Sequence, residues 1–143
     1  MKSLQLLLFS VAVCAATLTG CVSTSPLDLP PEARGVALAP VSSPQVRVNQ
    51  PALGTRQGQL LLLGSVAKGN GYGYSTTGSH LDIVFLDEAG RVLKETTVQF
   101  SPRELARAVP PRHPAKSGSY SLPLESLPSG TVRIEVRAHA ASH

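Results

Sequence analysis

The strongest constraint on the fold is a two-residue alternation of apolar and polar side chains that recurs through most of the chain. Between Val132 and Ala138, aliphatic residues alternate with Arg and Glu. A period of two indicates a β-strand with one buried and one solvated face. The stretch Leu81 to Leu86 is apolar at every position except Asp82, which predicts a strand covered on both faces over part of its length.

A hairpin is expected after this second strand. The sequence Asp87-Glu88-Ala89-Gly90 reads as a solvated loop in which Gly90 takes a positive φ. The returning strand runs from Arg91 to Phe100. Lys94 shares a face with the apolar positions of that strand, so either its aliphatic stem snorkels or a bulge shifts the register.

Three further strands and one short helix complete the prediction. The strands are Val46–Val48, Gln59–Ala67 and Ser119–Leu124, and the helix is Ser101–Ala108 with Ser101 as its cap. The four leucines at 60–63 would also fit a buried helix, but the flanking glycines favour a strand. Pro123 cannot donate to a ladder, so its strand lies at an edge or breaks there. About six strands without βα alternation predict an all-β, antiparallel, immunoglobulin/fibronectin-like β-sandwich over residues 45–139, with a frayed end at 140–143.

The composition narrows the possible functions. Aromatic residues make up 4% of the 143 residues and Trp is absent. This composition disfavours a helical bundle and an enzyme whose deep pocket is lined by large side chains. The net charge of +4 comes from scattered Lys and Arg, and nucleic-acid binding would need them clustered on one face. We therefore expect no nucleic-acid partner.

The N-terminus has the order of features found in an exported protein. Lys2 is followed by a mostly apolar run from Leu4 to Leu18, too short to span a membrane permanently, which indicates a signal peptide over residues 1–20. The sequence Leu18-Thr19-Gly20-Cys21 resembles the lipobox of bacterial lipoproteins. This resemblance implies cleavage before Cys21 and attachment of palmitate and other acyl chains to it. An ordinary signal peptide cut nearby is the alternative.

Cysteine usage agrees with lipidation. Cys14 lies in the apolar run and would be removed with it, leaving Cys21 as the only Cys of the mature chain, so no intramolecular disulfide can form. Multiple acyl chains make a lasting membrane anchor. Val22, rather than Asp, follows the Cys, which by the sorting rule of such lipoproteins implies the outer membrane of a Gram-negative host, with the domain facing the periplasm.

Residues 21–44 have the composition of a tether. Five prolines are spread among Ser, Thr and Ala without a lasting apolar period, so we expect an extended and solvated segment. Leu27 and Leu29 could instead form an edge strand.

A second resemblance supports the fold. The pattern Gly64-Ser65-Val66, then Asp82 to Asp87, then Gly90-Arg91-Val92-Leu93 is similar to small β-sandwich lipoproteins of bacteria. It covers some thirty residues, largely a two-strand hairpin consensus. It implies a fold and a compartment but no site residues.

Histidines are the candidate metal ligands. His80, His113, His139 and His143 could bind Cu²⁺ or Zn²⁺, which prefer nitrogen donors. The spacing of His139 and His143 helps only on a helix, and solvated surface histidines are the simpler interpretation. The only Met is Met1, so a Met-based Cu(I) site is excluded from the mature chain.

Two other segments are candidates for binding. The loop Lys68–Gly78 is rich in glycine and carries Tyr72 and Tyr74, which could contact a glycan or an envelope protein or simply pack over the sandwich end. The segment 103–116 gathers Arg and Lys that could meet phosphates or an acidic partner, or could form a solvated basic loop.

No catalytic set stands out. There is no G-x-S-x-G motif, and the adjacency of Ser79 and His80 carries no geometric weight, because a triad is assembled in space. We expect a non-catalytic outer-membrane lipoprotein, without cofactor, whose sandwich binds or supports another envelope component. A periplasmic Cu/Zn-binding protein is the alternative. A small hydrolase ranks third, and it would need Ser79, His80 and an acid within hydrogen-bond reach.

Overall fold

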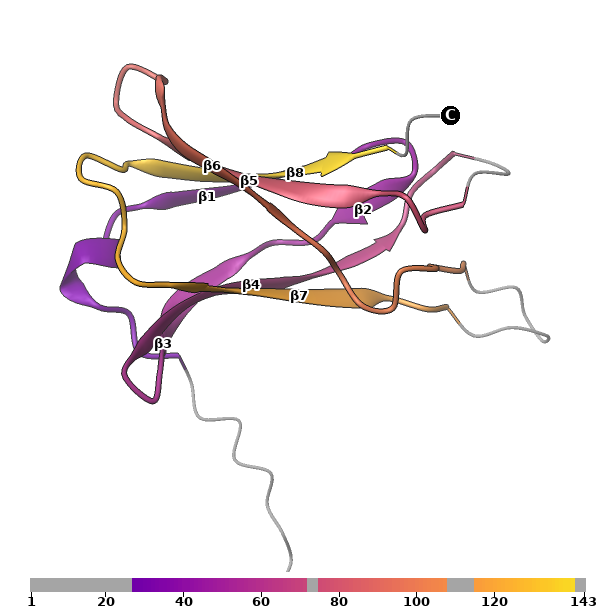
Figure 1. The fold of residues 1–143 in the computed structure, drawn as a ribbon, viewed down its shortest axis with the longest axis horizontal. Coiled ribbons are helices and arrows are strands. Elements are labelled where there is room, and N and C mark those ends of the chain that lie inside the picture. The colour runs from indigo at the N-terminus through magenta and orange to yellow at the C-terminus, as the bar shows by residue number, and fades with distance from the viewer. Residues whose placement is uncertain (1–26, 72–74, 108–114, 141–143) are drawn as a thin grey trace, which may run out of the picture.

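Two β-sheets packed face to face form the protein in this computed structural model, which describes residues 27–71, 75–107 and 115–140 (Figure 1). A single turn of 3₁₀ helix, η1 (Pro31–Ala33), precedes eight strands. In chain order the strands are β1 (Ala37–Val41), β2 (Val46–Val48), β3 (Ala52–Arg56), β4 (Gln59–Lys68), β5 (His80–Leu86), β6 (Val92–Val98), β7 (Gly118–Leu124) and β8 (Arg133–His139). The predicted all-β sandwich is confirmed.

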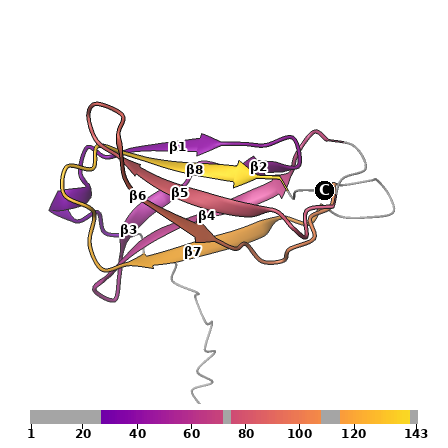
Figure 2. The ribbon, with the colours of Figure 1, turned by 45° about the horizontal axis from the view of Figure 1, so that its top comes forward.

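The first sheet has the order β1-β8-β5-β6, which can be followed in Figure 2. All its pairs are antiparallel except β1 with β8, which is parallel and departs from the expected antiparallel arrangement. In the second sheet, β4 pairs with β7 along one side. Its other side pairs with β3 over residues 59–63 and with β2 over residues 66–68. β4 is thus central, and β7, which carries Pro123, lies at an edge as predicted.

The core lies between the two sheets. Its largest fully buried side chains include Phe85 of β5, Phe100 after β6 and Leu62 of β4. β5 is buried on both faces from Leu81 to Leu86, as its sequence predicted. Ile83 and Phe85 point into the core, and Val84 lies on the outer face among long side chains of the neighbouring strands.

The β5–β6 hairpin has the predicted turn. Gly90 has φ +76°, and the Asp87 carboxylate accepts hydrogen bonds from the Arg91 backbone N–H at 2.9 Å and from Arg91 Nε at 2.7 Å. A register shift follows: Leu86 pairs with Val92 and Phe85 pairs with Lys94, which leaves Leu93 as an extra residue. Of the two alternatives that Lys94 left open, the structure has the bulge.

The prediction that residues 21–44 form a flexible tether is wrong from Asp28 onward. The Asp28 carbonyl accepts from the Thr55 N–H at 2.7 Å and from the Thr55 hydroxyl at 3.0 Å, which fastens the chain to β3. A Cβ on Gly54 would lie 2.5 Å from the Cβ of Leu27, so only glycine permits this approach. Ala33 is buried, and β1 pairs with β8. The sandwich therefore includes most of the predicted tether.

The predicted helix at Ser101–Ala108 is also wrong over its described residues. Ser101 exchanges backbone hydrogen bonds with Ser119, and Ala106 does so with Lys116. The backbone groups of this segment find partners on other segments instead of four residues back, so no helical turn forms. Among the described residues, no helix is long and apolar enough to cross a membrane.

We label the two ends of the sandwich by what they carry. The hairpin end holds the β3–β4, β5–β6 and β7–β8 turns, together with Asp28. The distal end holds the end of β4, the start of β5 and the end of β8 (Figure 1).

Tyr120 offers a test of the core. Its ring is buried, its hydroxyl has no hydrogen-bond partner among the described residues, and burial raises the pKa of Tyr120 to about 12. A buried hydroxyl without a partner costs about 1–3 kcal/mol. We expect Tyr120→Phe to raise the free energy of unfolding by about 1 kcal/mol in urea denaturation. A decrease would mean that this hydroxyl makes a stabilising bond.

Candidate functional site

Two of the four predicted metal-ligand histidines lie side by side. His80 begins β5 and His139 ends β8, and the antiparallel register places them directly opposite each other. Their rings are stacked with centroids 5.3 Å apart and an angle of 4° between their planes. His113 and His143 lie outside the described residues, as do Cys21, Tyr72 and Tyr74.

A third donor joins this pair. Asp82, two residues after His80 on the same face of β5, lies with its Oδ2 3.0 Å from His139 Nε2 and its Oδ1 3.9 Å from His80 Nε2. One donor atom from each of the three residues lies within 4.8 Å of the others. We name His80, Asp82 and His139 the distal cluster.

The surroundings of the distal cluster hold the carboxylate in place. Thr97 of β6 donates its hydroxyl to Asp82 Oδ1 at 2.7 Å. Arg137, which is paired with Asp82 across β5 and β8, directs its guanidinium to Glu135 at 2.7 and 2.9 Å. That ion pair lowers the pKa of Glu135, with a smaller contribution from Arg133. Among the described residues, no Arg or Lys forms an ion pair with Asp82.

The loop Lys68–Gly78, which we name the Gly/Tyr loop, is anchored on both sides of residues 72–74. Gly69 and Gly71 donate their backbone N–H groups to the carbonyls of Gln45 and Pro44. On the other side of residues 72–74, the buried Thr76 hydroxyl donates to the Arg103 carbonyl at 2.7 Å and accepts from the Leu105 N–H at 2.8 Å. The loop is therefore joined to the segment that follows β6.

In the basic segment 103–116, two arginines among the described residues are engaged in hydrogen bonds to loop carbonyls. Arg103 donates to the carbonyls of Thr77 and Ser79, and Arg107 donates to the carbonyl of Gly69. These two guanidinium groups join the segment after β6 to the Gly/Tyr loop and the residue that follows it. Their hydrogen bonds explain where they lie without a phosphate ligand. Arg112 lies outside the described residues.

Ser79 does not meet the distal cluster. It is fully buried and donates its hydroxyl to Gln45 Oε1 at 3.0 Å, whereas His80 and Asp82 lie on the outer face. The requirement set for a hydrolase, with Ser79, His80 and an acid in mutual reach, is not met by this arrangement.

Asp87 and Glu88 lie in the β5–β6 turn, and the Arg91 backbone and side chain lower the pKa of Asp87.

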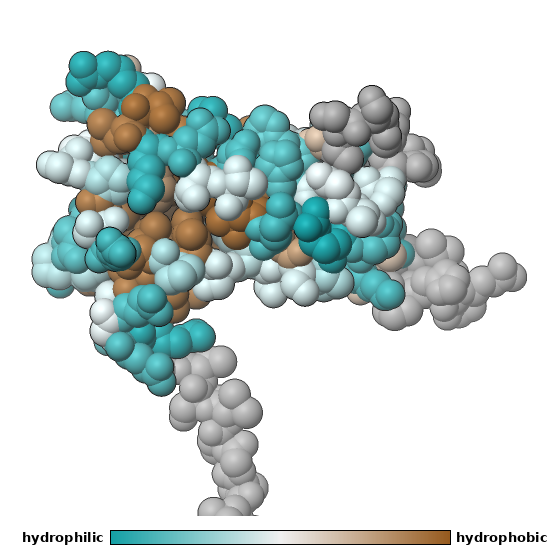
Figure 3. Space-filling model, viewed as in Figure 1, coloured by the Kyte–Doolittle hydropathy of each residue, from teal (hydrophilic) through white to brown (hydrophobic). Residues whose placement is uncertain are grey.

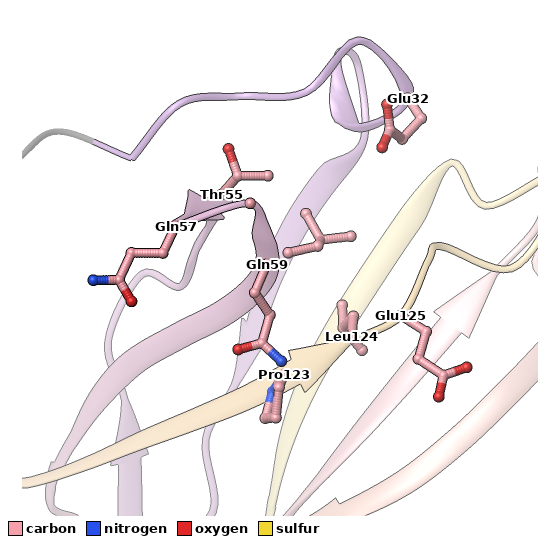
Figure 4. Close-up of a pocket in the computed structure, with 9 residues that line it drawn as sticks. Glu32, Thr55, Gln57, Gln59, Pro123, Leu124 and Glu125 are labelled. Atoms are coloured by element: carbon pink, nitrogen blue, oxygen red, sulfur yellow. The ribbon is translucent and has the colours of Figure 1, made fainter.

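The hairpin end carries a shallow depression of about 570 Å³, bordered by the β3–β4 turn, η1 and the end of β7 (Figure 4). Two carboxylates line it, Glu32 and Glu125. Figure 4 shows Gln57 and Glu125 pointing away from each other on opposite sides of this depression. These two polar side chains therefore do not converge on one point in the depression.

No protein-family profile, curated protein or solved structure matches this chain. The interpretation of the site therefore rests on the geometry described above.

Glu104 offers a test of the loop anchoring. The hydroxyls of Thr77 and Ser75 donate to its Oε2 at 2.6 and 2.8 Å and lower the pKa of Glu104 below its usual 4.5. A lowered pKa in the folded state stabilises the fold above pH 4.5, and this contribution is lost as the pH falls through the folded-state pKa.

We expect Glu104→Gln to reduce the free energy of unfolding at pH 7 by less than about 1 kcal/mol, since the group is exposed. The difference from the parent chain should shrink as the pH falls below 4.5. Urea denaturation at several pH values measures this. Glu88→Gln, in the exposed β5–β6 turn, is the control, and a pH-independent difference for Glu104→Gln would contradict the expectation.

Proposed function

We propose that this protein is a non-catalytic, lipid-anchored β-sandwich held close to the outer membrane by its hairpin end, with its distal end free to bind another component of the envelope. The observation that carries the proposal is the fastening of Asp28 to Thr55 of β3. Only residues 22–26 separate Cys21 from the first described residue. A fully extended chain of this length spans at most about 20 Å.

Exposed apolar side chains support the same orientation. Among the described residues, the exposed large hydrophobics are Leu29, Val41, Val92, Leu93 and Val132. All but Val41 belong to the hairpin end, and Figure 3 shows apolar surface gathered toward that end on the face in view. Apolar side chains beside an acyl anchor add to its affinity for the interfacial region of a bilayer.

The proposal of a binding role is supported by what the distal end displays. It carries the distal cluster, and the Gly/Tyr loop begins and ends there. Loops held on a rigid sheet scaffold are common sites of recognition. The class of partner that fits is a protein or glycan of the envelope.

The anchor is tested by replacing Cys21. We expect Cys21→Ala to abolish incorporation of labelled palmitate and to move the protein from the membrane fraction to the soluble periplasmic fraction. Cys14→Ala is the control, because Cys14 lies in the apolar run that would be removed. A parent chain that takes up no palmitate, or a Cys21→Ala variant that stays in the membrane fraction, would refute the proposal.

The orientation is tested by photo-crosslinking in intact cells. A photoreactive amino acid at Val41, near the distal end, should yield a discrete adduct with another envelope component. The same residue at Val92, at the hairpin end, is the matched control, since both valines are exposed on strands of the same sheet. A discrete adduct with an envelope component from Val92, with none from Val41, would contradict the assignment of the two ends.

A further inference from the structure

The register of β5 and β8 gathers three metal-binding side chains on one face of the sheet. His80 and His139 are direct cross-strand partners, so their side chains leave the sheet on the same side. Asp82, two residues further along β5, points to that side as well. The strands β5 and β8, which lie side by side in Figure 2, thus supply two imidazoles and a carboxylate to one place.

The donor atoms converge instead of spreading into solvent. Both Nε2 atoms face the carboxylate of Asp82, at 3.0 Å from His139 and 3.9 Å from His80. Ligands about 2.0–2.1 Å from a tetrahedral Zn²⁺ lie about 3.3 Å from one another. The three donors, all within 4.8 Å, need movements of about 1 Å to reach that spacing. The side chains of His80 and His139 are 35% and 52% exposed, so their rings have room to turn.

The carboxylate is held ready for a cation. The side chain of Asp82 is 12% exposed, Thr97 fixes one of its oxygens, and the nearest cross-strand guanidinium belongs to an ion pair with Glu135. A largely buried carboxylate is costly without a compensating charge. A divalent cation coordinated by Asp82 and the two imidazoles would supply it.

The donor set selects the metal. Two neutral imidazoles and one carboxylate suit Zn²⁺ and Cu²⁺, whereas Ca²⁺ and Mg²⁺ prefer oxygen ligands alone and Cu(I) prefers sulfur. We propose that the distal cluster is a binding site for a first-row transition ion, Zn²⁺ or Cu²⁺, with His80, Asp82 and His139 as ligands and Thr97 as the residue that positions the carboxylate. Three protein ligands leave a coordination position open to water or to a donor from outside the chain.

This site goes beyond the proposed function and does not depend on it, because metal binding can be measured whether or not Cys21 is acylated. Isothermal titration of the full chain in detergent with ZnSO₄ or CuSO₄ at neutral pH should show one ion bound per chain. His80→Ala and His139→Ala should each weaken the affinity more than about a hundredfold, since loss of a ligand exceeds the usual effect of losing a supporting residue.

The matched control is the double variant His113→Ala/His143→Ala, which removes two histidines outside the distal cluster. It should bind as tightly as the parent chain. The electron paramagnetic resonance spectrum of bound Cu²⁺ should show coupling to two imidazole nitrogens in the parent chain and to one in His139→Ala. No binding by the parent, or affinity lost in the double variant and kept in His80→Ala, would overturn the proposal.

Thr97 supplies a finer test. Thr97→Val keeps the β-branched shape on β6 and removes the hydroxyl that donates to Asp82. We expect it to weaken metal affinity by about tenfold. Thr97→Ser, which keeps the hydroxyl, should restore the affinity. Equal affinity in the Val variant and the parent would remove Thr97 from the site.

Discussion

The pairing of β5 with β8 is the interaction on which the rest of the structure depends. On the inner face it sets Ile83 opposite Val136 and Phe85 opposite Ile134, at the centre of the core. On the outer face the same pairing sets His80 opposite His139. A slip of one residue would turn every side chain of a strand to the other face. Burial of the aliphatic residues therefore fixes the geometry of the polar ones.

The strands that could be predicted are those with strong local patterns. β4, β5 and β8 carry long apolar or alternating runs, and each appears close to its expected bounds. β1 and β3 are not predicted, because their own residues carry no strong local pattern. β1 contains Pro40 and is largely exposed, and it is a strand because it lies along the edge of β8. β3 contains Gly54, which serves the approach of Leu27. Both depend on neighbours distant in sequence, which no local period reveals.

The distal cluster, like β1 and β3, depends on contacts between residues distant in sequence. The sequence alone indicates His80 and His139 as candidate metal ligands, but their meeting depends on a strand pairing between segments separated by most of the domain. Asp82 was read only as an interruption in an apolar strand. The sequence His80-Leu81-Asp82 places two potential metal ligands on one face of a strand, and this spacing could have identified Asp82 as a third ligand. Conversely, Ser101 as a cap suggests a helix at Ser101–Ala108, whereas the backbone of Ser101 binds Ser119 and the Glu104 carboxylate binds Thr77 and Ser75.

The two open edges of the β1-β8-β5-β6 sheet bear on how crowded copies of the chain would behave. An unpaired edge strand is a template on which another chain can add a strand. β1 carries Pro40, which has no N–H to offer, and β6 is interrupted by its bulge at Leu93 and bears the exposed charges Lys94 and Glu95. Neither edge presents an uninterrupted row of hydrogen-bonding groups. Crowded copies of the chain would thus meet without adding strands to one another's sheets at these two edges.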